Sequence, residues 1–354
     1  MKKTKILMCG SHLSVKGGMV SVVKNYLKCK QWGEYEIIYI PTHIEKNKIA
    51  VLLYFIIAYI KILFIVIFGK ISIAHLHTSE RGSFFRKAIL AKTLKKFGIK
   101  IILHHHGAEF ESFYANLSNR NKKFVNKTLE SVDLNIVLSQ RLIPTIKNKA
   151  PHAKVSVLYN AVPTLKNNPY TIRSHNCLFL GRLGQRKGIY DLLEAIQQID
   201  TELPSDIKFY LCGDGEIDRV KEKITYLKIT HRIAYVGWLD DFQKNQVFKS
   251  TAVSILPSYN EGLPMSILEA MSFGIPVIST NIASIPEVVF SGINGYLIQP
   301  GDIKSLGNNI IQLMENDSKR YAMSNKAFAF ISNSFSLNRH ISDLKKIYQR
   351  LQLK

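Results

Sequence analysis

The chain has 354 residues, of which 46% are hydrophobic and 21% charged, so it is long enough for two domains with buried cores and is not a disordered or low-complexity chain. Lys and Arg number 48 against 26 Asp and Glu, and this net charge of +22 favours an anionic partner: a phosphate-bearing substrate, a nucleic acid or an anionic membrane. The four cysteines (Cys9, Cys29, Cys177 and Cys212) form no C-x-x-C pair, which excludes a zinc or disulfide framework and indicates a reducing compartment.

The apolar stretch nearest the N-terminus, Ile6–Cys9, is too short for a signal peptide and predicts a first buried strand. The next apolar run, residues 49–68, has membrane-spanning length, and only Lys61 interrupts it. A soluble-type strand, Ile71–His75, follows directly, which disfavours a single membrane span. Two interpretations stay open: a very apolar helix packed on a sheet, or a helix whose outer face lies in the membrane interface.

Short apolar runs alternate with stretches of helical spacing along the whole chain. The expected strands of the first half are Ile6–Cys9, Tyr35–Ile40, Ile71–His75, Ile99–Leu103, Leu134–Leu138 and Val155–Leu158. Those of the second half are Cys177–Leu180, Lys208–Cys212, Ile233–Val236, Val253–Leu256, Pro276–Ser279 and Gly295–Ile298. Strands that alternate with helices form parallel sheets covered on both faces, so the chain is predicted to be α/β with two doubly wound domains.

The expected boundary between the domains is a Pro- and Asn-rich stretch over residues 161–170, which suits neither helix nor strand. It divides an N-terminal domain over residues 1–165 from a C-terminal domain over residues 172–335. The last segment, 336–354, is predicted to be an amphipathic helix that packs back on the N-terminal domain. Two such domains would face each other across a cleft, and ligands bind beyond the carboxyl ends of parallel strands.

Two groups of residues follow strands of the N-terminal half. Gly17 and Gly18 precede a helical stretch, where their N–H groups would approach a phosphate, although a plain tight turn explains them equally. Five histidines stand at two neighbouring strand ends: His75, His77, His104, His105 and His106. Alternation puts His104 and His106 on one face, and Gly107 would admit a ligand. Substrate binding is favoured over simple packing in a polar loop. A metal site is the least favoured interpretation, because no third element brings an acidic or cysteine ligand.

Two stretches of the C-terminal half carry stronger signals. The turn GRLGQRKG at 181–188 places Arg182 and Lys187 after a strand and before a helix, which suits a diphosphate; a basic surface turn is the alternative. Farther on, Pro264 fits the first position of a helix, with Glu261 in the loop before it and Glu269 in its second turn. The two carboxylates would accept hydrogen bonds from sugar hydroxyls, or one favours the helix N-terminus while the other is solvated.

Together these motifs resemble the retaining glycosyltransferases of family 4, which have the two-Rossmann GT-B fold. The likeness is strongest in GRL-x-x-x-KG at 181–188 and in the E-x7-E pair of Glu261 and Glu269. HHHGAE at 104–109, YNAVP at 159–163 and GGM at 17–19 support it in the expected order. The family implies transfer of a sugar from a nucleotide-sugar to an acceptor hydroxyl with retained anomeric configuration.

The resemblance also assigns roles to residues of this chain. Arg182 and Lys187 would hold the donor diphosphate and stabilise charge on the leaving group, and His106 would bond the sugar near its anomeric centre. Glu261 would contact the sugar hydroxyls and Glu269 the ribose. The catalytic set expected from the resemblance is His106, Arg182, Lys187 and Glu261, and the substrate-binding set is Gly17, Gly18, Gly107, Gly181, Gly262, Leu263 and Glu269.

No D-x-D motif occurs, so neither a metal nor another cofactor is expected, and Arg and Lys supply the positive charge instead. A UDP-sugar is expected before a GDP-sugar, with a glycan or lipid-linked acceptor in surface or capsular polysaccharide assembly. The enzyme is expected to be cytoplasmic and peripheral on the inner face of an anionic membrane. A nucleotide-sugar epimerase on the same fold is an alternative. A nucleic-acid-binding protein ranks lower, because only the net charge suggests it.

Overall fold

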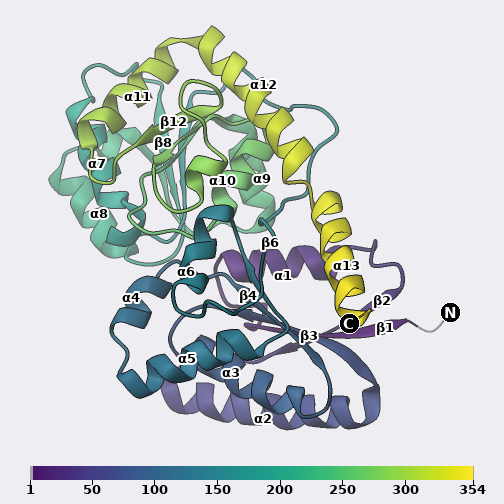
Figure 1. The fold of residues 1–354 in the computed structure, drawn as a ribbon. Helices are drawn as coiled ribbons and strands as arrows, with labels where there is room; N and C mark the ends of the chain where they lie inside the picture. Colours follow the sequence, from purple (N-terminus) through teal and green to yellow (C-terminus); the bar gives the residue numbers. More distant parts are fainter. Residues whose placement is uncertain (1–2, 354) are drawn as a thin grey trace. The chain divides into compact units, whose positions relative to one another are not determined.

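The structure is a computed structural model that describes residues 3–353, and it divides into two compact units. Unit 1 comprises the described residues up to Ala161 together with the segment from Leu337, and unit 2 is Val162–Ser336 (Figure 1). Each unit contains one six-stranded sheet in which every pairing between neighbouring strands is parallel. The predicted fold class is therefore confirmed, and every expected strand coincides with an observed one.

The sheet of unit 1 has the strand order β2-β1-β3-β4-β5-β6. Its strands are β1 (Thr4–Gly10), β2 (Tyr35–Pro41), β3 (Ile71–Thr78), β4 (Lys100–His105), β5 (Leu134–Val137) and β6 (Val155–Val157). Its helices are α1 (Gly18–Lys28), α2 (Lys48–Gly69), α3 (Gly82–Lys95), α4 (Phe110–Ala115), α5 (Asn119–Ser131), α6 (Ile143–Lys147) and α13 (Leu337–Gln352), with the short 3-10 turn η1 (Gln140–Leu142). The chain leaves β2 at one edge and returns to β3 on the other side of β1, so the strand order reverses between β1 and β3.

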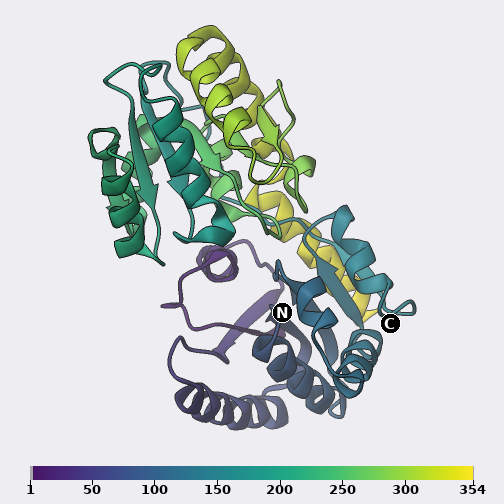
Figure 2. The same ribbon diagram turned by 90° about the vertical axis from the view of Figure 1, so that its left-hand side faces the viewer.

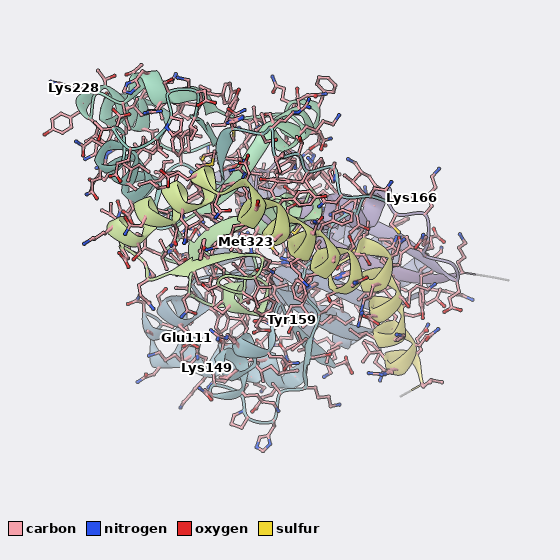
Figure 3. All side chains as sticks on the ribbon, turned by 90° about the horizontal axis from the view of Figure 1, so that it is seen from above. Glu111, Lys149, Tyr159, Lys166, Lys228 and Met323 are labelled. Atoms are coloured by element: carbon pink, nitrogen blue, oxygen red, sulfur yellow. The ribbon has the colours of Figure 1, made fainter. Side chains whose placement is uncertain are left out.

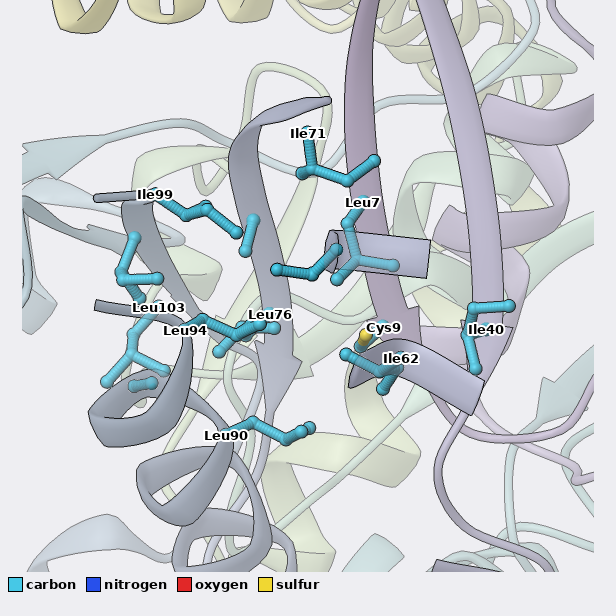
Figure 4. Close-up of a cluster of buried hydrophobic side chains, with 14 of the residues drawn as sticks. Leu7, Cys9, Ile40, Ile62, Ile71, Leu76, Leu90, Leu94, Ile99 and Leu103 are labelled. Atoms are coloured by element: carbon cyan, nitrogen blue, oxygen red, sulfur yellow. The ribbon is translucent and has the colours of Figure 1, made fainter. Parts of the chain in front are cut away.

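The core of unit 1 fills both faces of its sheet, as expected for parallel strands buried on both sides. On one face Leu7, Leu76 and Leu103 pack against Ile62 of α2 and Leu90 of α3 (Figure 4). On the opposite face, rings from α1 and α13 pack against histidines of β3. A surface ion pair adds a link between α4 and the segment after α6, since Lys149 Nζ lies 2.7 Å from the Glu111 carboxylate (Figure 3).

Helix α2 covers the expected apolar run, and it packs on the sheet as one of the two interpretations predicts. Asn47 caps its N-terminus by accepting a hydrogen bond from Ala50 N (2.9 Å), and Lys70 ends it in the left-handed region. One narrow stripe is buried against the sheet: Phe55, Ala58, Ile62 and Val66. The other faces expose nine large apolar side chains: Ile49, Leu52, Leu53, Ile56, Ile57, Ile60, Phe64, Ile67 and Phe68. By length and composition α2 is the one helix within residues 3–353 that is able to cross a membrane.

The sheet of unit 2 has the order β12-β11-β10-β7-β8-β9, with helices on both sides (Figure 2). Its strands are β7 (Asn176–Leu180), β8 (Lys208–Cys212), β9 (Ile233–Gly237), β10 (Thr251–Leu256), β11 (Val277–Thr280) and β12 (Gly295–Ile298). Its helices are α7 (Ile189–Gln198), α8 (Ile217–Tyr226), α9 (Asp241–Ser250), α10 (Met265–Ser272), α11 (Ile303–Glu315) and α12 (Asp317–Ser334), with the 3-10 turns η2 (Gln185–Lys187), η3 (Thr230–Arg232) and η4 (Ile285–Glu287). Here the strand order reverses between β7 and β10, the position where open α/β sheets bind ligands.

Candidate active site

The two loops that flank this reversal in unit 2 are held tightly together. The turn after β7 contains η2, and the backbone of Tyr259 in the loop after β10 donates to Arg186 O (2.9 Å). Gly188 closes the turn with φ +70°, and a Cβ there would lie 2.0 Å from Pro257 O. Only glycine fits both the left-handed backbone and this close approach. The sequence thus brings the GRLGQRKG turn directly against the loop that carries Glu261.

Lys187 and Glu261, predicted separately, form an ion pair in the structure. Glu261 is 5% exposed, and its Oε1 also accepts a hydrogen bond from Ser258 Oγ (2.8 Å). A buried carboxylate needs a compensating charge, and the ammonium of Lys187 supplies it. The pair therefore places one cation and one carboxylate side by side at the carboxyl ends of β7 and β10.

Arg182 lies in the same turn but reaches solvent. Its Nη1 lies 3.7 Å from Asp214, a residue of the loop after β8, and about three fifths of its side chain is exposed. The backbone fixes the turn from that side as well, since Leu183 N donates to Asp214 O (2.6 Å). Arg182 is thus a cation with an accessible end on a fixed backbone, which is suited to an anionic ligand.

Glu269 has a different partner from Glu261. It lies in α10, and its Oε2 is 3.1 Å from Lys244 Nζ of α9. Burial raises the pKa of Glu269, and Lys244 acts in the opposite direction. Local sequence gave no signal for Lys244, which is one lysine among many in a basic chain. Pro264 lies one position earlier than predicted: α10 begins at Met265, and Pro264 is the extended residue before it.

The remaining predicted residues of unit 2 belong to the same two loops, after β7 and after β10. Gly181 follows β7 directly, and its N–H donates to Cys212 O (2.9 Å). Gly262 and Leu263 are buried in the loop between β10 and α10, next to Glu261. In unit 1, Gly17 precedes α1 with φ +136° and open space around its Cβ position, and Gly18 is the first residue of that helix.

His106 lies at the end of β4 in unit 1. Its backbone N–H donates to Thr78 O (2.7 Å), and its Nε2 lies 2.8 Å from His77 Nδ1. Burial lowers the pKa of His106 to about 3, with a smaller contribution from neighbouring His105, so the ring is neutral near pH 7. The space expected for a ligand at Gly107 holds the carboxylate of Glu80, whose Oε1 lies 2.1 Å from where a Cβ would stand.

The neighbouring histidines form a stack. His75, His77 and His104 are buried, and each has a ring nitrogen within 4.8 Å of the others. A metal lies in the plane of each imidazole that binds it, but the rings of His75 and His77 are nearly parallel, with centroids 4.5 Å apart and an interplanar angle of 14°. Such rings do not converge on one ion. Hydrogen bonds join His75 to His104 (3.0 Å) and to Tyr348 Oη of α13 (2.7 Å).

Sequence reasoning missed the aromatic partners of this stack. The Tyr26 ring of α1 lies 5.8 Å from that of His77, and its hydroxyl is hydrogen-bonded to His340 Nε2 of α13. Burial lowers the pKa of His75 to about 3 and that of His340 to about 4, and it lowers the pKa values of His77 and His104 well below the ordinary value. These partners lie far from the histidines in sequence, so no local pattern predicts them.

Comparison with known proteins gives matches over both units. Residues 173–330 match the protein family described as "Glycosyl transferases group 1". The Escherichia coli protein named "UDP-Gal:alpha-D-GlcNAc-diphosphoundecaprenol alpha-1,3-galactosyltransferase" is 27% identical over 310 residues, which cover 79% of this chain and 75% of that protein. The structure of sucrose-phosphate synthase from Thermosynechococcus elongatus has a TM-score of 0.82 at 16% identity over 99% of both chains. Anabaena HepE in complex with UDP and glucose has a TM-score of 0.77 at 18% identity, over 98% of this chain and 99% of that one.

Proposed function

Because the chain belongs to the group 1 glycosyl transferases, family 4, and has the GT-B fold, we propose that it transfers a sugar from a UDP-sugar to an acceptor hydroxyl with retention of anomeric configuration. The choice of UDP is supported by the Escherichia coli relative, whose name contains UDP-Gal, and by the HepE structure, which holds UDP and glucose. The same relative is named for a diphosphoundecaprenol acceptor, which supports a lipid-linked acceptor in polysaccharide assembly.

The observation that carries the proposal is the Lys187–Glu261 pair beside Arg182 at the strand reversal of unit 2. When the donor binds, Lys187 and Arg182 hold the diphosphate and stabilise the charge that develops on the departing UDP. Lys187 then shares its positive charge with phosphate oxygens, and Glu261 accepts hydrogen bonds from hydroxyls of the sugar. Glu269, held by Lys244, accepts from the ribose.

The residues of unit 1 complete the proposed roles. His106 bonds the transferred sugar as a neutral imidazole, and His77 holds its Nε2 in place. The N–H groups at Gly17 and Gly18 approach the phosphates at the start of α1. No metal takes part in the proposed step, since the two cations of unit 2 supply the positive charge, so activity is expected to survive EDTA.

The test is transfer activity of Arg182→Ala and Lys187→Ala. Each variant loses a charge-assisted contact to the diphosphate, and we expect kcat/KM to fall about 10- to 100-fold. Lys223→Ala is the matched control, because Lys223 forms an ion pair with Glu194 (3.0 Å) on the surface of the same unit and should keep full activity. Full activity in both test variants would refute the mechanism. Incubation with the UDP-sugar alone separates an epimerase, which changes the donor without an acceptor.

We also propose that the enzyme is cytoplasmic and binds the inner membrane surface through α2. This helix exposes nine large apolar side chains in addition to its buried stripe, and its sequence contains no acidic residue. Lys46, Lys48, Lys61 and Lys70 lie in or beside it and would meet anionic headgroups. Because the opposite stripe belongs to the core of unit 1, the helix lies along the membrane rather than across it.

A further inference from the structure

A buried cation lies at the ends of β1 and β2 in unit 1, and none of the proposed roles uses it. Lys87 of α3 is 1% exposed, and its Nζ donates a hydrogen bond to Thr42 Oγ1 (2.5 Å). Thr42 Oγ1 in turn donates to Gly10 O (3.1 Å). An ammonium group has three N–H donors, and no carboxylate pairs with Lys87 among the described residues. The charge is therefore buried with one neutral partner.

Two neighbours add buried nitrogen atoms without hydrogen-bond partners at the same place. Arg86 precedes Lys87 on α3, and its buried Nε has no hydrogen-bond partner. His43 follows Thr42, and its buried Nδ1 also has none. Burial, together with repulsion by Arg86 and Lys87, lowers the pKa of His43 to about 4. His43 is also the chain neighbour of Thr42, the hydrogen-bond partner of Lys87. Burial likewise lowers the pKa of Lys87 to about 8, which leaves it protonated near neutral pH.

The surroundings increase the positive field. The guanidinium of Arg86 turns back toward the first turn of α3, since its Nη1 lies 3.1 Å from the Cβ position of Gly82. That turn contains no acidic residue and no side-chain cap, so no carboxylate within it offsets the positive end of the helix. Among its N–H groups, Ser83 N donates to Glu80 O (3.2 Å). The acid nearest in sequence, Glu80, instead accepts a hydrogen bond from Glu109 N.

Such an arrangement is costly in the free protein, because buried charges without counter-ions destabilise a fold. It lies at the carboxyl ends of parallel strands, beside the reversal between β1 and β3, where ligands of α/β sheets bind. Arg86 and His43 are partly exposed and connect the buried ammonium to solvent. We propose that Lys87, Arg86 and His43 form an anion site in unit 1 that binds the phosphate or diphosphate group of the acceptor.

The assignment to the acceptor rests on the proposed function, while the anion site itself does not. Unit 2 already offers Arg182 and Lys187 for the donor diphosphate. The cations of unit 1 are therefore assigned to the other substrate, as a second phosphate-bearing ligand. Two cations, the buried Lys87 and the partly exposed Arg86, suit a group with several oxygens and more than one negative charge. A lipid-linked acceptor joined through a diphosphate carries such a group.

The experiment uses the whole chain with UDP at saturation, so that the donor site is filled, and titrates farnesyl diphosphate and inorganic pyrophosphate by thermal shift. We expect Lys87→Met and Arg86→Gln each to raise the dissociation constant of both probes about 10- to 100-fold. Lys92→Met removes an exposed lysine from the same helix and should bind both probes like the wild type. Unchanged binding in Lys87→Met would overturn the proposal.

Stability without ligand gives an independent readout. Lys87→Met removes a buried, uncompensated charge at nearly constant volume, so the ligand-free variant should melt at a higher temperature than the wild type. A lower melting temperature would make Lys87 a structural donor and overturn the site. If the variant also loses its response to UDP, the anion belongs to the donor, and the acceptor assignment is wrong. If UDP never stabilises the wild type but pyrophosphate does so through Lys87, the anion site stands and the proposed function fails.

Discussion

Gly188 is the residue on which the geometry of the unit 2 site depends most directly. Gly188→Ala would place a methyl group 2.0 Å from Pro257 O on a backbone that L-residues rarely adopt. The turn must then move away from the loop after β10, and Lys187 loses its contact with Glu261. We expect a loss of about 2–4 kcal/mol in the free energy of unfolding and a large loss of transfer activity, measured by denaturant titration and by assay.

Gly292→Ala separates the effect of backbone strain from the effect of the clash with Pro257 O. Gly292 has a similar φ of +79° but nothing within 4 Å of its Cβ position, so the substitution adds backbone strain without a clash. It should cost about 1–2 kcal/mol and leave activity intact. Equal effects of the two substitutions would show that the approach of the two loops is unimportant.

For single residues, the sequence predicted which side chains belong to the candidate site but not which partners they contact. The types of residue at 182, 187, 261 and 269 pointed to a diphosphate and sugar hydroxyls, because cations bind phosphate oxygens and carboxylates accept hydrogen bonds from hydroxyl groups. The partners were not predictable: Lys244 resembles every other lysine of the chain, and the carboxylate of Glu80 fills the space at Gly107 from a different strand end. Pairings between side chains depend on the packing of separate loops, which no local pattern encodes.

Among the elements, the strands could be predicted from the sequence, but whether the helix over residues 49–68 packs in the core or binds a membrane could not. Parallel strands buried on both faces appear as continuous apolar runs, which is why β1 and β10 could be placed from the positions of such runs along the chain. The run 49–68 was ambiguous for a physical reason. A helix with one buried stripe and an exposed apolar remainder satisfies the criteria for a core helix and for a membrane-bound helix at once.

Helix α2 allows a direct test of membrane binding. Ile57 and Phe64 are 67% and 64% exposed, so Ile57→Glu with Phe64→Glu should leave the fold intact. Binding to vesicles that contain anionic lipid, measured by co-sedimentation at low salt, should fall at least about tenfold, because apolar burial is lost and like charges repel. Phe242→Glu in α9 is the matched control: Phe242 is 71% exposed in unit 2, and its loss should not affect binding. Failure of the wild-type protein to bind would contradict the proposal.

For the whole molecule, the histidines make unit 1 sensitive to acid. Seven have lowered pKa values there: His43, His75, His77, His104, His105, His106 and His340. All of them are buried except His43 and His106, which are half-buried. The unfolded chain binds protons at these groups below about pH 6.5 while the folded unit does not, so stability falls as the pH drops from 6.5 toward 4. Each group contributes up to about 1.4 kcal/mol per pH unit.

The two tryptophans report on the two units separately. Trp32 is buried in unit 1 between Tyr26 and Tyr348, while Trp238 is half-exposed in unit 2. In Trp238→Phe the fluorescence comes from Trp32 and reports unit 1 alone. The denaturation midpoint of unit 1 should then fall steeply between pH 7 and pH 5. Trp32→Phe, followed at Trp238, should show a weaker dependence. Parallel shifts in both variants would contradict an origin in the histidines of unit 1.

The return of the chain to unit 1 through α13 has a consequence for biosynthesis. Tyr348 and His340 fill the face of the first sheet that carries His75, yet the ribosome makes them only after all of unit 2. A nascent chain can therefore complete its second sheet while the first still lacks a covering layer, which reverses the usual N-to-C order of domain maturation. Until the closing helix emerges, the histidine face stays open, and premature termination anywhere within α13 would leave the earlier-synthesised half immature.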